Sequence, residues 1–144
     1  MDKWDKYFLL IAEEAAQLSK DPSTKCGAVI VDSMKRILST GFNGFPRHLD
    51  DDPKLYADRE VKYRRVVHAE MNAVVFARRE LLGCTLYTIP FLPCERCAPI
   101  IIQAGIRRIV APWIDLDSPL ALRHNTKEVI ELFREARVQI EFER

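Results

Sequence analysis

Two short segments place good zinc ligands in one chain. His68 is followed two residues later by Glu70, and Cys94 and Cys97 form a Pro-Cys-x-x-Cys segment. Imidazole and thiolate groups are common zinc ligands, and a catalytic zinc keeps three protein ligands with the fourth position open to water. The sequence therefore predicts one zinc ion per chain, bound by His68, Cys94 and Cys97. Glu70 lies close to this set and is predicted to carry protons there rather than to bind the metal.

A structural zinc site in a zinc-stabilised interaction module is the non-enzymatic alternative. Such a site needs a fourth protein ligand. The remaining thiols and imidazoles are the candidates, namely Cys26, Cys84, His48 and His124. None of them belongs to a second Cys-x-x-Cys pair, so the pattern favours the catalytic site.

Size and charge exclude several classes of protein. A chain of 144 residues predicts one domain, residues 1–144, with an adequate core. The net charge of +1 gives no basic field for a polynucleotide or an anionic membrane, so neither partner is expected. No apolar run is long enough to span a bilayer, and the first residues do not resemble a signal peptide. The four cysteines lack regular spacing, so we expect no disulfide framework and a cytoplasmic location.

The hydrophobic pattern predicts helices that alternate with strands. Helices are expected at residues 3–19, 68–80, 94–104 and 126–136. Strands are expected at residues 26–31, 36–42, 85–89, 108–111 and 138–142. Because strands alternate with helices, the sequence predicts an α/β fold with a mixed sheet covered on both faces. His68 and Cys94 are then expected at the starts of two helices.

Residues 47–66 form a charged insertion, which is long for a connection in a compact domain. It contains three consecutive aspartates at residues 50–52 and several arginines. The pattern leaves two interpretations open, a lid over the site and a solvent-exposed surface helix.

The motifs resemble those of the deoxycytidylate (dCMP) deaminases of the cytidine deaminase superfamily. The segments that carry the resemblance are residues 27–31, 41–44, 62–63, 68–73, 83–87, 93–97 and 102–106. The resemblance implies a three-layer α/β/α sandwich with a five-stranded mixed sheet and one catalytic zinc. It implies hydrolytic deamination of dCMP to dUMP and ammonia, with Glu70 as the catalytic acid and base. It also implies a homo-oligomer, either a dimer or a hexamer.

Substrate contacts follow partly from the same resemblance. The backbone N–H of Ala69 is expected to bind the carbonyl oxygen of the base, and Asn43 to bind the sugar. The stretch after the fourth strand, where many relatives carry basic residues, is acidic here. The phosphate is therefore expected to meet arginines of the insertion, with Arg47, Arg59 and Arg64 as candidates. The alternative is that these arginines pair with neighbouring carboxylates on the surface.

Other substrates stay open at this point. Related cytosine compounds, such as CMP, cytidine or a 5-modified dCMP, would suit the same chemistry. A tRNA adenosine deaminase shares the zinc motifs but usually lacks the long insertion. Many dCMP deaminases carry a second Cys/His zinc site in this insertion, but residues 47–66 contain no cysteine and only His48, so we expect a single zinc.

Overall fold

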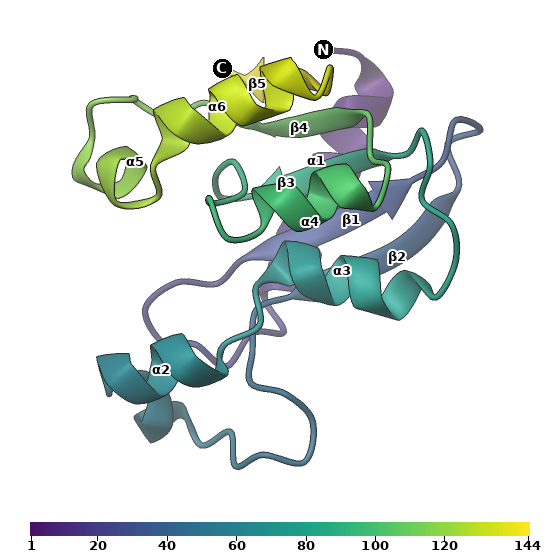
Figure 1. Cartoon of the computed structure of the whole chain (residues 1–144). Coiled ribbons are helices and arrows are strands. Elements are labelled where there is room, and N and C mark those ends of the chain that lie inside the picture. The colour runs from purple at the N-terminus through teal and green to yellow at the C-terminus, as the bar shows by residue number, and fades with distance from the viewer.

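The computed structural model describes residues 1–144 and contains one five-stranded sheet (Figure 1). Its strands are β1 (Gly27–Val31), β2 (Ile37–Phe42), β3 (Thr85–Ile89), β4 (Arg108–Pro112) and β5 (Gln139–Glu143). They lie in the order β2-β1-β3-β4-β5. β1 is antiparallel to β2 and β3, whereas β3, β4 and β5 run parallel to one another. The sheet is therefore mixed, as expected.

One helix covers one face of the sheet. Helix α1 (Lys3–Ala16) buries Phe8 and Leu9 against Val29, Tyr87 and Val110. Successive side chains of a strand point to opposite faces, so the alternate residues of the same strands must be covered by other elements. In the view of Figure 1, α1 lies behind the sheet.

Three helices cover the opposite face. They are α3 (Ala69–Ala77), α4 (Ala98–Gln103) and α6 (Thr126–Glu135). Ile30, Leu86 and Ile109 of the strands join one buried cluster with Ile101 of α4 and Phe133 of α6. The result is the three-layer α/β/α sandwich that the sequence resemblance implied.

The nine predicted helices and strands are all present, with shifts at their ends. α3 ends at Ala77, earlier than predicted, because Arg78 adopts a left-handed conformation that closes the helix. α4 begins only at Ala98, so Cys94 lies in the turn before the helix and not at its first residue. Helix α5 (Pro119–Arg123) was not predicted. The insertion contains η1 (Pro53–Tyr56) and α2 (Arg59–Arg65), and α2 buries none of its residues, which agrees with the surface-helix interpretation of residues 47–66.

Gly41 allows α3 to approach the sheet closely. A Cβ atom at this position of β2 would lie 2.3 Å from the backbone oxygen of Ala69, the first residue of α3. The absence of a side chain at Gly41 therefore sets how near the start of α3 lies to β2. This contact matters because His68 immediately precedes that helix.

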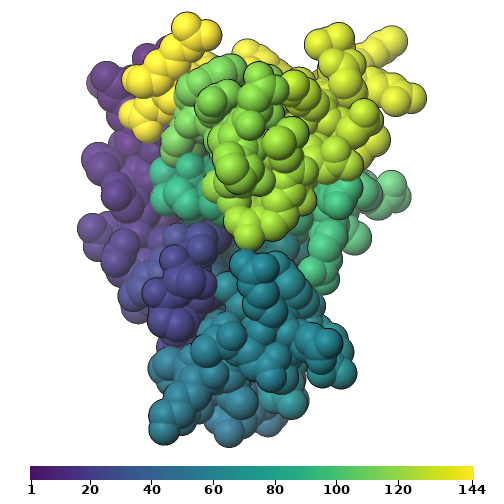
Figure 2. Space-filling model, turned by 90° about the vertical axis from the view of Figure 1, so that its left-hand side faces the viewer, coloured from purple at the N-terminus to yellow at the C-terminus, as the bar shows by residue number.

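The insertion, residues 47–66, contains η1 and α2 and projects from the sheet (Figure 1). Figure 2, which faces this side of the molecule, shows the teal insertion at the bottom and the yellow-green segment that contains α5 above it. None of the helices combines the length and the apolar character that crossing a membrane requires.

Candidate active site

His68 is held at the start of α3 by backbone contacts on either side. Val67 forms an isolated antiparallel bridge with Gly44, and the backbone oxygen of His68 accepts a hydrogen bond from the N–H of Asn72 at 3.0 Å. The His68 side chain does not cap the helix. Its ring is therefore available to face the turn that precedes α4.

Cys94 and Cys97 occupy that turn, which follows β3. The backbone oxygen of Cys94 accepts hydrogen bonds from the N–H groups of Cys97 and Ala98, at 3.1 and 3.0 Å. Cys97 is the residue that precedes α4. This tight turn brings both thiols to one side, as the Cys-x-x-Cys spacing predicts.

The three predicted ligands meet. The Nδ1 atom of His68 lies 3.4 Å from the Sγ atom of Cys94 and 3.3 Å from that of Cys97, and the three ligand atoms lie within 4.8 Å of one another. A tetrahedral zinc with bonds of about 2.0 Å to nitrogen and about 2.3 Å to sulfur would separate these atoms by roughly 3.6 Å. The donor set and its spacing therefore fit zinc.

The two thiols differ in acidity, since their mutual contact lowers the pKa of Cys94 and raises that of Cys97. Hydrogen bonding with Cys97, together with His68, holds the pKa of the Cys94 thiol well below its usual range. The thiolate is the form of cysteine that binds zinc. The group of possible ligands comprises His68, Cys94 and Cys97 alone. The alternatives considered as a fourth ligand, namely Cys26, Cys84, His48 and His124, do not belong to it.

Glu70 lies beside the possible metal ligands, in the first turn of α3. Its side chain is only 5% exposed, and its Oε1 atom accepts a hydrogen bond of 3.0 Å from the hydroxyl of Thr88. Its Oε2 atom lies 3.8 Å from the Sγ atom of Cys97. Burial raises the pKa of the Glu70 carboxyl. A buried carboxyl beside the ligand group is suited to take and return a proton in general acid–base catalysis.

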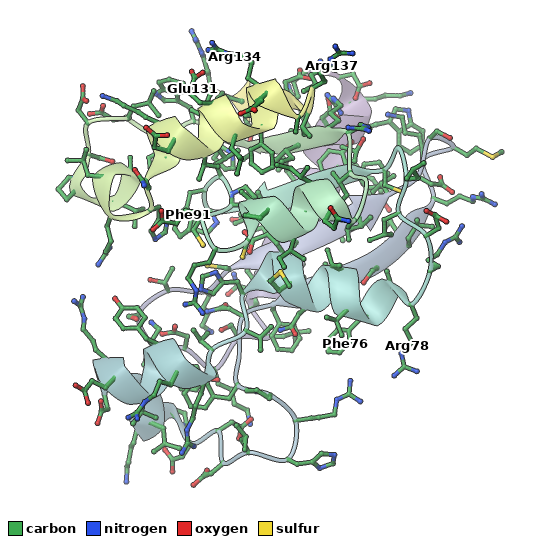
Figure 3. All side chains as sticks on the ribbon, viewed as in Figure 1. Phe76, Arg78, Phe91, Glu131, Arg134 and Arg137 are labelled. Carbon is green, nitrogen blue, oxygen red and sulfur yellow. The ribbon has the colours of Figure 1, made fainter.

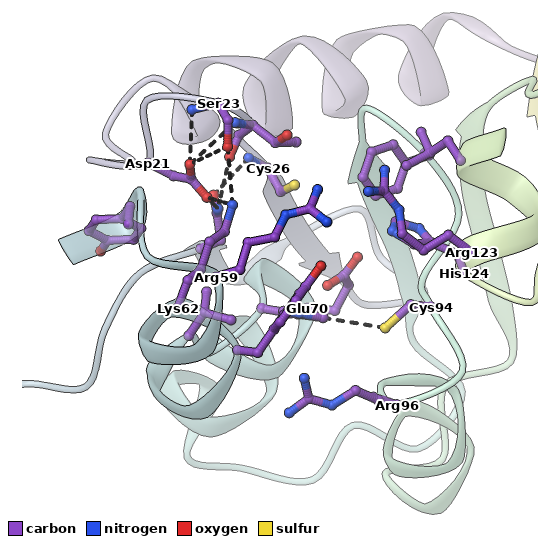
Figure 4. A pocket seen from close by; sticks show the side chains of 18 of the residues that line it. Asp21, Ser23, Cys26, Arg59, Lys62, Glu70, Cys94, Arg96, Arg123 and His124 are labelled. Atoms are coloured by element: carbon purple, nitrogen blue, oxygen red, sulfur yellow. Dashed lines mark hydrogen bonds and ion pairs between the residues drawn. The ribbon is translucent and has the colours of Figure 1, made fainter. Parts of the chain in front are cut away.

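A pocket of about 840 Å³ opens next to these groups. Figure 4 shows Glu70 and Cys94 directed into it, with Arg59 on one side and Arg123 and His124 on the other. The volume falls in the range of pockets that hold small ligands, from about 300 to about 1,000 Å³. Its cationic lining residues are Arg59, Lys62, Arg96 and Arg123.

The structure brings only some of the predicted substrate contacts to the pocket. Asn43 and Arg59 line it, and Ala69 is buried between His68 and Glu70. Arg47 and Arg64 do not line it, contrary to expectation. The guanidinium of Arg47 lies over the Phe76 ring, 5.4 Å from its centroid. Arg64 faces its own helix, with its Nε atom donating to the backbone oxygen of Glu60 at 3.2 Å.

Several pocket residues were not predicted from the sequence. Arg96 lies inside the Cys-x-x-Cys motif itself, a position that could have suggested its role. Arg123 ends α5, a helix too short to show periodicity. His124 contacts the Phe91 ring edge-on, at 4.8 Å between ring centroids. Thr88 does not line the pocket, and it contacts Glu70 because the fold brings β3 beside α3.

Comparison with known proteins identifies the family. A family model described as "Cytidine and deoxycytidylate deaminase zinc-binding region" matches residues 2–112. The chain belongs to this family. Members of the family are zinc-dependent hydrolytic deaminases, so the fit of His68, Cys94 and Cys97 to zinc agrees with the family assignment.

Individual relatives agree with this assignment. A protein of Aliivibrio fischeri described as an uncharacterized deaminase in the luxG 3' region is 46% identical over 112 residues, covering 78% of this chain and 74% of that protein. Human deoxycytidylate deaminase is 40% identical over 114 residues, covering 75% of this chain. The chain spans only 64% of the human protein and 58% of a probable deoxycytidylate deaminase of Drosophila melanogaster.

Solved structures confirm the fold. The dCMP deaminase of cyanophage S-TIM5, in complex with dCMP and dUMP, matches with a TM-score of 0.80. The match covers 99% of both chains at 23% sequence identity. The apo form of the same enzyme matches with a TM-score of 0.76. At this identity the likeness shows the three-layer arrangement and not the substrate.

Proposed function

We propose that this protein hydrolyses dCMP to dUMP and ammonia. One observation carries the proposal: the buried carboxyl of Glu70 lies beside the His68, Cys94 and Cys97 group, at a pocket whose lining includes three arginines. The names of the relatives support a cytosine nucleotide as the substrate, since several are deoxycytidylate deaminases.

The residues of the chain suggest how the reaction proceeds. Zinc held by His68, Cys94 and Cys97 would supply a Lewis acid that lowers the pKa of a water molecule. Glu70 accepts a proton from the water that attacks C4 of the cytosine ring and delivers that proton to N3. Glu70 then carries the proton of the new C4 hydroxyl to the amino group, which leaves as ammonia.

Two further groups would orient the base and the sugar. Ala69 is the first residue of α3, and the first N–H groups of a helix have no partner within the helix. Its N–H is therefore suited to bind the carbonyl oxygen of the base. Asn43 already bonds to the chain, since its Oδ1 accepts from the N–H of Cys26 at 2.8 Å and its Nδ2 donates to the oxygen of Thr24 at 2.9 Å. Oδ1 keeps a second lone pair, which could accept from a sugar hydroxyl.

Arg59 is the phosphate contact that we retain from the three predicted arginines. It extends from α2 toward the pocket, and Arg96 and Arg123 add positive charge at other points of its lining (Figure 4). A planar guanidinium can bind phosphate through paired hydrogen bonds, so arginine suits this role better than lysine.

An ammonia-release assay with the zinc-loaded protein tests the proposed substrate. We expect kcat/KM to be highest for dCMP among dCMP, CMP, cytidine, 5-methyl-dCMP and tRNA. Equal kcat/KM for cytidine and dCMP would show that the phosphate does not contribute to substrate recognition. Release from tRNA alone would favour the adenosine deaminase alternative, and release from none would favour the interaction module.

We further propose that residues 1–144 act as one deaminase domain, in the cytoplasm and as a homo-oligomer. All four cysteines are free, which suits a reducing compartment. Exposed apolar side chains support self-association, among them Val75 and Phe76 of α3 and Ile100 of α4. Phe76 points away from the sheet (Figure 3). Light scattering would show a dimer or hexamer if this is correct and a monomer if it is not.

A further inference from the structure

We propose that Lys62 is a positioning residue, whose ion pair with Asp21 holds α2 beside the pocket and so determines where Arg59 lies. The proposal rests on the proposed function, because the role of Arg59 belongs to it. The ion pair joins the insertion to the segment between α1 and β1, and both parts of the chain line the pocket.

Helix α2 has little apolar packing to hold it. None of its residues is buried, and Tyr56 of η1 is the one buried residue in the insertion. The Tyr56 ring stacks on Phe45 at 4.0 Å between centroids, and its hydroxyl accepts a hydrogen bond from the N–H of Phe45 at 3.1 Å. Apolar burial therefore anchors η1, whereas α2 depends on polar contacts.

The strongest of those contacts is made by Lys62. Its Nζ atom lies 2.6 Å from Oδ2 of Asp21 and donates to the hydroxyl of Ser23 at 3.1 Å. The Asp21 side chain is 1% exposed and that of Lys62 is 20% exposed, so water and salt screen this pair weakly. The second ion pair between the same segments, Lys20 with Asp51 at 2.7 Å, is solvent-exposed and contributes little.

Asp21, the partner of Lys62, is itself held by hydrogen bonds. Its Oδ1 accepts a hydrogen bond from the N–H of Ser23 at 2.9 Å, and its Oδ2 lies 3.4 Å from Nδ2 of Asn43. Burial alone would raise the pKa of Asp21, but the hydrogen bonds from Lys62 and Ser23 lower it, so the carboxylate stays ionised. Figure 4 shows these bonds converging on Asp21 and Ser23, beside Arg59.

Hydrogen–deuterium exchange tests the proposal without reference to activity. The variants are Lys62→Met, Asp21→Asn and the double variant. The double variant removes both charges of the pair, so that neither is left without a partner. The control is Lys54→Met, an exposed lysine of η1 outside the pocket. We expect exchange in residues 58–66 to rise at least about tenfold in the three test variants and to stay unchanged in the control. Unchanged exchange in all three, or an equal rise in β1 and β3, would overturn the proposal.

Kinetics separate positioning from direct binding of the phosphate by Lys62. If Lys62 acts through Asp21, Lys62→Met and Asp21→Asn both raise KM for dCMP, and the double variant is no worse than Lys62→Met alone. Lys62→Arg should restore most of the affinity. If Asp21→Asn leaves KM unchanged or lowers it while Lys62→Met raises it, Lys62 binds the phosphate itself and the proposal is wrong. Absence of dCMP turnover in the wild type would contradict the proposed function. The hydrogen–deuterium exchange experiment would still decide whether Lys62 holds α2 in place.

Discussion

The hydroxyl of Thr88, on β3, lies 3.0 Å from Oε1 of Glu70, on α3. Both side chains are buried. A hydroxyl can donate to a carboxylate and can also accept from a carboxylic acid, so it suits a residue that changes its protonation state. The backbone oxygen of Phe91, 3.4 Å away, can accept a hydrogen bond from the Thr88 hydroxyl when Glu70 is protonated. Thr88 thus orients Glu70 in both states.

We expect Thr88→Val to lower kcat for dCMP about tenfold, because the carboxyl loses its buried partner. Zinc content should not change, since Thr88 does not belong to the ligand group. Thr88→Ser, which keeps a hydroxyl, is the matched control and should retain most of the activity. Equal kcat for Thr88→Val and the wild type would show that the bond does not matter for the reaction.

Two of the four cysteines are predicted to bind zinc, and the other two are not. Purified wild-type protein should contain one zinc per chain by elemental analysis. Cys94→Ser and Cys97→Ser should lose most of it, because removal of one of three protein ligands weakens the site strongly. Cys26→Ser and Cys84→Ser should retain it. Full zinc in Cys94→Ser, or loss in Cys26→Ser, would refute the ligand assignment.

Arg59 should distinguish a nucleotide from a nucleoside. We expect Arg59→Ala to lower kcat/KM for dCMP by roughly ten- to a hundredfold and to leave that for cytidine nearly unchanged, since only dCMP carries the phosphate. Arg64→Ala is the matched control, because Arg64 belongs to the same helix and lies outside the pocket. If Arg59→Ala and Arg64→Ala change the ratio of kcat/KM for dCMP to kcat/KM for cytidine equally, Arg59 is not the phosphate contact.

Stability in acid should depend on Asp5, a buried residue of α1. Bonds to Arg108, at 2.7 Å, hold the pKa of Asp5 at about 2, below its usual 3.8. A lowered pKa means that the ionised form stabilises the fold, by about 2 kcal/mol above pH 4, and that this contribution is lost as the pH falls from about 4 to about 2.

Urea unfolding at several pH values tests this effect. The difference in unfolding free energy between the wild type and Asp5→Asn should be largest above pH 4 and shrink toward pH 2. A difference that stays constant over this range would show that the Arg108 pair does not shift the Asp5 titration. Glu131→Gln, at an exposed ion pair of α6, is a control that should show little difference at any pH.

The regular elements and the zinc ligands could be predicted from the sequence because both leave local signals. The buried residues of β1 form a continuous apolar run, and the Cys94 and Cys97 spacing is short and specific. The ligand group in the structure matches the predicted one. Glu70 was also found beside it, as expected from its position in α3.

The pocket walls were not predictable in the same way. Arg47, Arg59 and Arg64 are all arginines of the same charged insertion, so the sequence does not distinguish them. Their positions in the folded insertion decide that Arg59 faces the pocket. Arg123 reaches the pocket from α5, and Thr88 meets Glu70 from β3, so each is brought to the site by an element far along the chain from α3. No local sequence pattern records such placement. Sequence therefore identified the chemistry of the site better than its specificity.

Ammonia release from dCMP by the zinc-loaded wild type and Glu70→Gln, measured side by side, tests the central claim most directly. Gln has nearly the same volume as Glu but cannot carry a proton, so we expect turnover to fall at least about a hundredfold while zinc content stays at one per chain. The account would be contradicted if the wild type released no ammonia from dCMP, or if Glu70→Gln retained near-normal turnover.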